Sequence, residues 1–166
     1  MSKVGPAGRS YQPIFPNDLK RLLQIATQDQ TAFFKEYPDW GKLYRRRKIC
    51  IALCQGAALH YVNGATGIND FDVYTFYKKH PARNWYAKRN KPYDFGDPKF
   101  GQSVDKPDYI GRRVDCLARG IDVKTGEDPA AAIRRYLKAG RTETARLLAL
   151  KAVVLLEPDC GEIIWP

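Results

Sequence analysis

Short apolar runs rich in β-branched and aromatic residues constrain the fold of this chain more than any other feature. The clearest run is Phe71–Tyr77, and two others are Ile49–Leu53 and the segment 109–119, centred on Val114–Leu117. Such runs are typical of buried strands. Because helical patterns separate them, they predict an α/β (α+β) domain in which helices cover a small mixed β-sheet.

Proline, glycine and capping residues mark the expected helix boundaries. Pro16 predicts the start of the first helix, and Pro38 the end of the second. Asp128 followed by Pro129 predicts a later helix start, and Gly140 predicts its end. The predicted helices cover approximately residues 16–26, 29–37, 39–47, 56–62, 129–139 and 142–150, and further strands cover 153–156 and, at a sheet edge, 162–165.

The chain has the length and composition of one soluble globular domain. Its 166 residues are 44% hydrophobic and 28% charged, which excludes the disordered class. We expect a flexible N-terminal arm at residues 1–15 and a single domain over 16–166. The N-terminus lacks the apolar segment of a signal peptide, and no stretch approaches the length that spans a bilayer. We therefore expect a cytoplasmic protein without a membrane partner.

The cysteines predict a reduced setting. Cys50, Cys54, Cys116 and Cys160 form no Cys-x-x-Cys pair, and only two histidines are available to complete a zinc set. Three of the four cysteines lie in apolar segments. Buried free thiols are the expected state of these three, in agreement with a reducing compartment.

The net charge of +10 favours a polyanionic partner such as a nucleotide or nucleic acid, although the same charge also serves solubility. Part of it falls in an insertion between two predicted strands, residues 78–110, where cations alternate with aromatic rings. That combination suits phosphate contact and base stacking. A loop whose aromatics pack on the core is the equally weighted alternative. The cations are Lys78, Lys79, Arg83, Lys88, Arg89, Lys91 and Lys99, and the aromatics are Trp85, Tyr86, Tyr93, Phe95 and Phe100.

Three acidic residues, Asp70, Asp72 and Asp115, lie within or beside the predicted strands. Side chains of a strand alternate between its faces, so Asp70 and Asp72 point the same way, with backbones about 7 Å apart. Carboxylates in apolar segments are costly to desolvate unless a cation compensates them. The trio therefore predicts a site for one or two Mg²⁺ (or Mn²⁺) ions, suited to phosphoryl or nucleotidyl transfer. Alternatively, Asp70 is a turn residue and Asp72 a solvent-facing acid.

A second element precedes these acids. In the run Leu53-Cys54-Gln55-Gly56-Ala57, Gly56 stands where a buried strand would turn into a helix. Backbone amides at such a helix start can hold phosphate oxygens, and glycine permits their close approach. The run therefore predicts a phosphate-binding turn.

Together these residues resemble the motif of the nucleotidyltransferase superfamily, typified by DNA polymerase beta and the minimal bacterial nucleotidyltransferases. That motif has an apolar residue, Gly, then Gly or Ser, a gap of about nine to thirteen residues, Asp-apolar-Asp or Glu, and a third acid on a later strand. Here twelve residues separate Gly56-Ala57 from the pair Asp70 and Asp72, and Asp115 follows. Ala57 departs from the pattern, since the family has Gly or Ser there.

The resemblance covers about residues 49–118 and implies a nucleotidyltransferase-like fold and function. It implies that Asp70, Asp72 and Asp115 bind two magnesium ions and that Asp115 also helps to deprotonate the attacking hydroxyl. The implied reaction moves a nucleoside monophosphate from a nucleoside triphosphate to an unidentified hydroxyl acceptor. A nucleic acid, a protein or a small molecule could supply that hydroxyl.

Four further residues are expected to bind the nucleotide. Gly56 and Ala57 would do so through backbone amides, and Lys78 and Arg113 through their charges. One of Arg112 and Arg113 could neutralise the acids or meet a phosphate, and a surface ion pair is an equal alternative. Two alternatives stay open: a catalytically weak protein of the same fold that binds nucleic acid or a protein partner, which Ala57 and the charge favour, and a metal-dependent nuclease.

Overall fold

Six strands form one sheet in the order β3-β4-β2-β1-β5-β6 in the computed structural model, which describes residues 8–85 and 91–166. β2 and β4 run parallel, and the other neighbouring strands run antiparallel. The mixed sheet expected from the sequence is therefore confirmed. The strands are β1 (Lys48–Cys54), β2 (Phe71–Lys78), β3 (Lys91–Asp94), β4 (Arg113–Ile121), β5 (Ala152–Glu157) and β6 (Ile163–Trp165).

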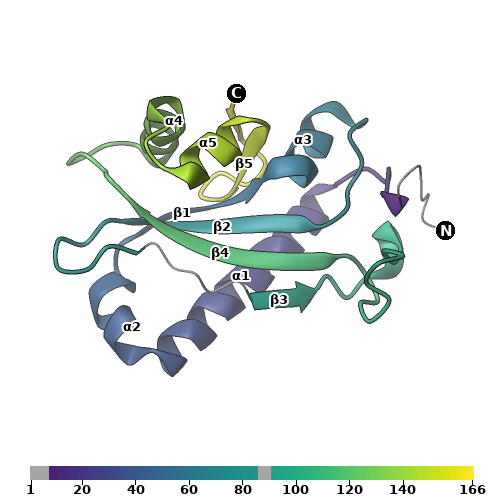
Figure 1. The fold of residues 1–166 in the computed structure, drawn as a ribbon, viewed down its shortest axis with the longest axis horizontal. Coiled ribbons are helices and arrows are strands. Elements are labelled where there is room, and N and C mark those ends of the chain that lie inside the picture. Colours follow the sequence, from purple (N-terminus) through teal and green to yellow (C-terminus); the bar gives the residue numbers. More distant parts are fainter. Residues whose placement is uncertain (1–7, 86–90) are drawn as a thin grey trace.

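Helices cover both faces of this sheet. α1 and α2 lie on one face, and α4 and α5 lie on the other (Figure 1). No helix among the described residues combines the length and apolarity needed to cross a bilayer. The α-helices of these residues are α1 (Pro16–Glu36), α2 (Pro38–Tyr44), α3 (Gln55–Asn63), α4 (Pro129–Ala139) and α5 (Glu143–Ala149), and a short 3₁₀ helix, η2, spans Pro98–Phe100.

Alternation along the strands builds a separate core on each face. On β2, Phe71 and Val73 join the cluster packed under α1 and α3, whereas Tyr74 and Phe76 join the cluster under α4 and α5. All four side chains are buried. A strand that is covered on both faces has apolar residues at nearly every position, as β2 does in the sequence. This explains why β2 is easy to predict.

The predicted boundaries of α4 are confirmed by its caps. The Asp128 carboxylate accepts a hydrogen bond from Ala131 N at 3.3 Å, and Pro129 occupies the first turn. Gly140 ends the helix with φ of 58°, in the left-handed region that glycine adopts at little cost. These caps end α4 just before α5, and the two helices lie together on one face of the sheet (Figure 1).

One expectation about the first half of the chain needs correction, and the structure describes part of the expected N-terminal arm. A single helix, α1, replaces the two helices expected over 16–37, because Thr27 and Gln28 interrupt the apolar pattern only on the exposed face, while Ile25 and Phe33 continue the buried one. The expected flexible arm, residues 1–15, falls partly outside the described residues. Its described part is anchored: Ser10 and Ile68 exchange two backbone hydrogen bonds of 2.9 and 2.8 Å.

The described part of the insertion at 78–110 contains regular secondary structure. Residues 91–94 form the edge strand β3 beside β4, and η2 follows. Trp85, Phe95 and Phe100 are at most 2% exposed, so these aromatics pack in the core and are not free to stack on bases. Tyr86, Lys88 and Arg89, which the sequence placed in the same basic and aromatic stretch, lie outside the described residues.

Candidate functional site

The three predicted acids meet at one end of the sheet. Asp72 on β2 is the register partner of Asp115 on β4, and Asp70 lies two residues before Asp72, just ahead of β2. Neighbouring strands lie about 4.8 Å apart, so the Asp72 and Asp115 carboxylates leave adjacent backbone positions on the same face. This end, where β2 and β4 begin, is on the right of Figure 1.

Two of the acids are already paired with cations of the chain. Lys106 Nζ lies 2.5 Å from Asp70 Oδ2, and Arg113 Nε lies 2.6 Å from Asp115 Oδ1. Within residues 8–85 and 91–166, Asp72 makes no salt bridge. Arg113, expected to bind nucleotide or to neutralise the acids, is therefore seen in its neutralising arrangement.

The surroundings of Asp72 disturb its ionisation. Its burial, followed by the charges of Asp115 and Asp70, raises its pKa to about 6, although Lys106 and Lys151 act in the opposite direction. A carboxylate whose pKa is raised by burial and by neighbouring carboxylates is typical of sites that bind a cation or transfer a proton, and of structural acid clusters.

The stability of Asp72→Asn relative to wild type is expected to depend on pH. Because the pKa of folded Asp72 is about 6, above its ordinary value of 3.8, the folded chain binds more protons than the unfolded chain between these values. The stabilisation by this group is therefore full below a pH of about 4 and is lost as pH rises through about 6. Since one pKa unit corresponds to about 1.4 kcal/mol, the variant should gain up to about 3 kcal/mol relative to wild type across this range. Urea denaturation at both pH values measures the gain, and a pH-independent difference would contradict the assignment.

The start of α3 borders the same end of the sheet. Gln55 turns the chain from β1 into α3 with a left-handed φ of 61°, and the helix N-cap, Cys54, supplies no side-chain hydrogen bond. A Cβ on Gly56 would lie 3.7 Å from Lys151 Nζ, which places this ammonium beside the first turn. Backbone amides and a lysine thus lie close to the acids, in an arrangement that favours anions.

Ala57 contributes differently from the side chain that the motif expects. Ala57 as a whole residue is 2% exposed, and it belongs to the core cluster shared with α1. A serine at this position would place its hydroxyl in that buried location.

Lys78 is not part of this arrangement. It ends β2, six residues beyond Asp72, and strands rise about 3.3 Å per residue, so the two lie about 20 Å apart. The structure therefore separates Lys78 from the acids with which the sequence grouped it.

Two lysines near the acids were not singled out by the sequence, and Arg112 was considered there only together with Arg113. Lys106 and Lys151 come from loops far apart in the chain, and nothing local marks them. Arg112 is fully buried, and its Nε donates to Phe100 O at 3.0 Å. In the described part of the chain its two terminal nitrogens and Asp70 Oδ1 are buried without hydrogen-bond partners. Burial lowers the pKa of Arg112 and the Asp70 charge raises it, so the two groups interact.

The donor set at this end fits a hard divalent cation in part. Asp72 and Asp115 provide adjacent carboxylate oxygens, which Mg²⁺ prefers, and one Asp115 oxygen is already bonded to Arg113. Asp70 has one oxygen bonded to Lys106 and one without a partner among the described residues. No group of three His, Cys, Asp or Glu side chains in those residues is arranged to hold a metal ion. The fit therefore rests on Asp72 and Asp115, with Asp70 nearby.

Comparison of this chain with family models, curated proteins and solved structures gave no match. The fold class is α+β, with a mixed sheet covered on both faces.

Proposed function

We propose that this protein is a metal-dependent nucleotidyltransferase, which moves a nucleoside monophosphate from a nucleoside triphosphate to a hydroxyl acceptor. The observation that carries the proposal is the register pairing of Asp72 with Asp115 on two parallel strands. The start of α3, with Gly56 and Lys151, lies beside this pair and suits a phosphate chain.

Each group has a distinct role in this proposal. Asp72 and Asp115 hold Mg²⁺ or Mn²⁺, which supplies charge neutralisation at the transferred phosphorus. The amides of Gly56 and Ala57, with the Lys151 ammonium, hold the leaving phosphates. Asp115, next to the reacting centre, orients the attacking hydroxyl and accepts its proton.

Label transfer tests the proposal directly. The protein is incubated with Mg²⁺, a cell extract and each α-labelled nucleoside triphosphate in turn, and pyrophosphate release is followed in parallel. The proposal predicts that label from at least one triphosphate enters a macromolecule or small molecule with matching pyrophosphate. Absence of both signals for every triphosphate, with Mg²⁺ and with Mn²⁺, would contradict it.

A second candidate is favoured by the ion pairs at the site. Because Lys106 and Arg113 already neutralise Asp70 and Asp115, the cluster satisfies much of its own charge without a metal. That state suits a catalytically weak protein of similar architecture that binds nucleic acid or a protein partner. Salt-sensitive binding to RNA or DNA without label transfer would favour this candidate.

A further inference from the structure

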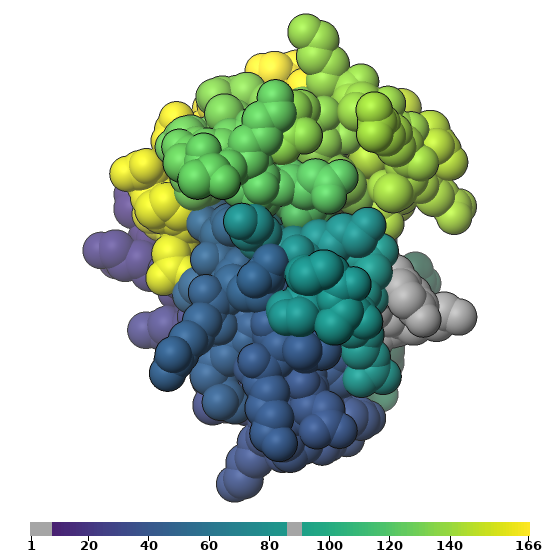
Figure 2. Space-filling view, turned by 90° about the vertical axis from the view of Figure 1, so that its left-hand side faces the viewer, coloured from purple at the N-terminus to yellow at the C-terminus, as the bar shows by residue number. Residues whose placement is uncertain are grey.

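The end of the sheet opposite to the acids is strongly basic. Residues 45–47, three arginines, form the turn between α2 and β1, and Lys78 and Lys79 lie at the end of β2. Figure 2 looks onto this end: the blue residues of the turn and the teal residues that follow β2 lie together near the middle of the face, with green residues above them. Two basic segments from distant parts of the sequence thus share one surface.

Arg47 fixes these two segments to each other. Its guanidinium donates from Nε to Lys78 O at 3.0 Å and from Nη2 to Lys79 O at 2.8 Å, and Lys78 N donates to Arg47 O at 2.8 Å. Arg46, Lys78 and Lys79 are exposed on this braced backbone. Among the residues described by the structure, none of these three forms an ion pair. Their charges are therefore available to an external anion.

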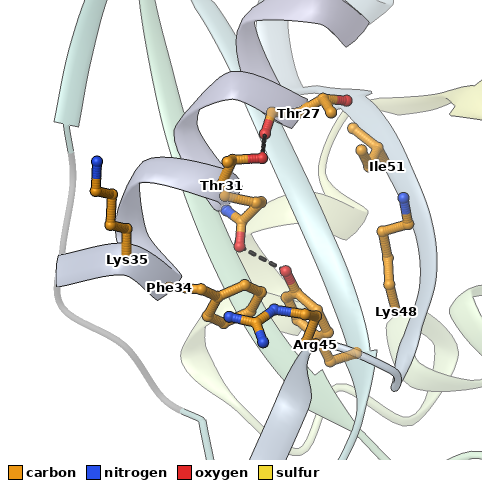
Figure 3. A pocket seen from close by; sticks show the side chains of 9 residues that line it. Thr27, Thr31, Phe34, Lys35, Arg45, Lys48 and Ile51 are labelled. Atoms are coloured by element: carbon orange, nitrogen blue, oxygen red, sulfur yellow. Dashed lines mark hydrogen bonds between the residues drawn. The ribbon is translucent and has the colours of Figure 1, made fainter. Parts of the chain in front are cut away.

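A hollow of about 430 Å³ lies beside this turn, between α1 and the start of β1. The Tyr77 hydroxyl donates to Gln30 Oε1 at 2.5 Å within it, and the Arg45 guanidinium lies 5.7 Å from the centre of the Phe34 ring (Figure 3). One of its cations, Lys48, is paired with Glu157 at 2.6 Å. The cations that line the hollow are Lys35, Arg45 and Lys48.

A second hollow, of about 250 Å³, lies on the other face of the sheet. It is bounded by the end of β4 and the turn between α4 and α5, and its lining includes Lys79, Arg135 and Arg141. Arg135 is bonded to Glu127 at 2.7 Å, whereas Arg141 and Lys79 are exposed. Cations therefore continue from one face of the sheet, across the braced turn, to the other face. We call this surface the basic band: Lys35, Arg45, Arg46, Lys48, Lys78, Lys79 and Arg141.

We propose that the basic band binds the phosphate backbone of a nucleic acid strand, running from the hollow beside α1 across Lys78 and Lys79 to the hollow beside α4. An arginine guanidinium can donate two hydrogen bonds to one phosphate group, and lysines add positive charge along the nucleic acid strand. The sheet edges are β3 and β6, so this end offers a peptide no strand edge to extend. Binding here does not rest on the acid site, which lies at the other end of β2.

Matched double variants test the proposal. Lys78→Ser with Lys79→Ser removes two charges from the basic band, and Arg9→Ser with Lys20→Ser removes two exposed charges elsewhere. Fluorescence anisotropy with labelled single-stranded RNA and DNA, without Mg²⁺, measures affinity at several salt concentrations. The band variant should bind about tenfold more weakly at low salt, with a salt slope smaller by about 1 to 2, and the control should bind within about twofold of wild type.

Equal losses in the two variants would overturn the proposal, because net charge alone would then explain binding. Competition by polyglutamate as effective as by RNA, or equal binding to phosphatidylserine vesicles, would also overturn it. Circular dichroism of both variants confirms that each remains folded. We expect Asp72→Asn to bind RNA with the affinity of wild type. RNA binding by the basic band can therefore be tested independently of nucleotidyl transfer at the acid site.

Discussion

Asp72→Asn is expected to lower nucleotidyl transfer by about three orders of magnitude while leaving the protein folded. In the proposed reaction a bound metal would supply several kcal/mol of charge stabilisation in the transition state, and we expect removal of one of its ligands to forfeit most of that. Asparagine keeps the shape of the side chain and removes the charge whose burial, together with repulsion from Asp115 and Asp70, raises the pKa of Asp72. Rates of label transfer, measured with saturating Mg²⁺, give the ratio.

Asp105→Asn is the matched control for that variant. Asp105 is an exposed carboxylate close in sequence to Lys106, and it lies outside the acid cluster. It should transfer label at the wild-type rate. A comparable loss in both variants, or a wild-type rate in Asp72→Asn, would remove Asp72 from the chemistry.

Phe71→Ala is expected to destabilise the fold by about 3 to 5 kcal/mol, the usual cost of emptying a buried aromatic site. Phe71 is fully buried, and its ring centre lies 5.3 Å from those of Phe95 and Phe100. This cluster holds the start of β2 against the segment that leads to Lys106. Urea denaturation measures the free energy of unfolding.

The control for this cavity is Ile110→Ala, in the same segment. Ile110 is 58% exposed, so its truncation should change stability by less than about 1 kcal/mol. A small effect of Phe71→Ala on the free energy of unfolding would contradict this expectation. Phe95 and Phe100 would then fill the cavity, or the aromatic cluster would contribute little to stability.

The sequence was sufficient for elements whose signals are local. Phe71–Tyr77 is apolar on both faces because β2 is covered on both, and Asp128, Pro129 and Gly140 mark α4 through its own backbone. The three acids were also found from their spacing, because alternation in a strand fixes which side chains share a face. Their meeting required β2 and β4 to be neighbours, which the structure shows.

The remainder depended on tertiary contacts that no local pattern encodes. β3 is four residues long and contains Pro92, so its pairing with β4 gave no strand signal. Trp85 and Phe95 looked available for stacking, yet the core buries them. Lys106 and Lys151 reach the acids from distant loops. Lys78 was grouped with the acids by sequence proximity, although a whole strand separates it from Asp72.

Manganese binding tests the central claim, a metal site at Asp72 and Asp115, most directly. Mn²⁺ is titrated calorimetrically into wild type, Asp72→Asn and Asp105→Asn at a pH of about 7.5, where Asp72 is ionised. Asp72→Asn removes a proposed metal ligand, whereas Asp105→Asn removes an exposed carboxylate outside the site. With a metal site at Asp72 and Asp115, wild type and Asp105→Asn should bind Mn²⁺, and Asp72→Asn should bind it at least about tenfold more weakly. Equal affinity of wild type and Asp72→Asn, or no binding by any of the three, would contradict it.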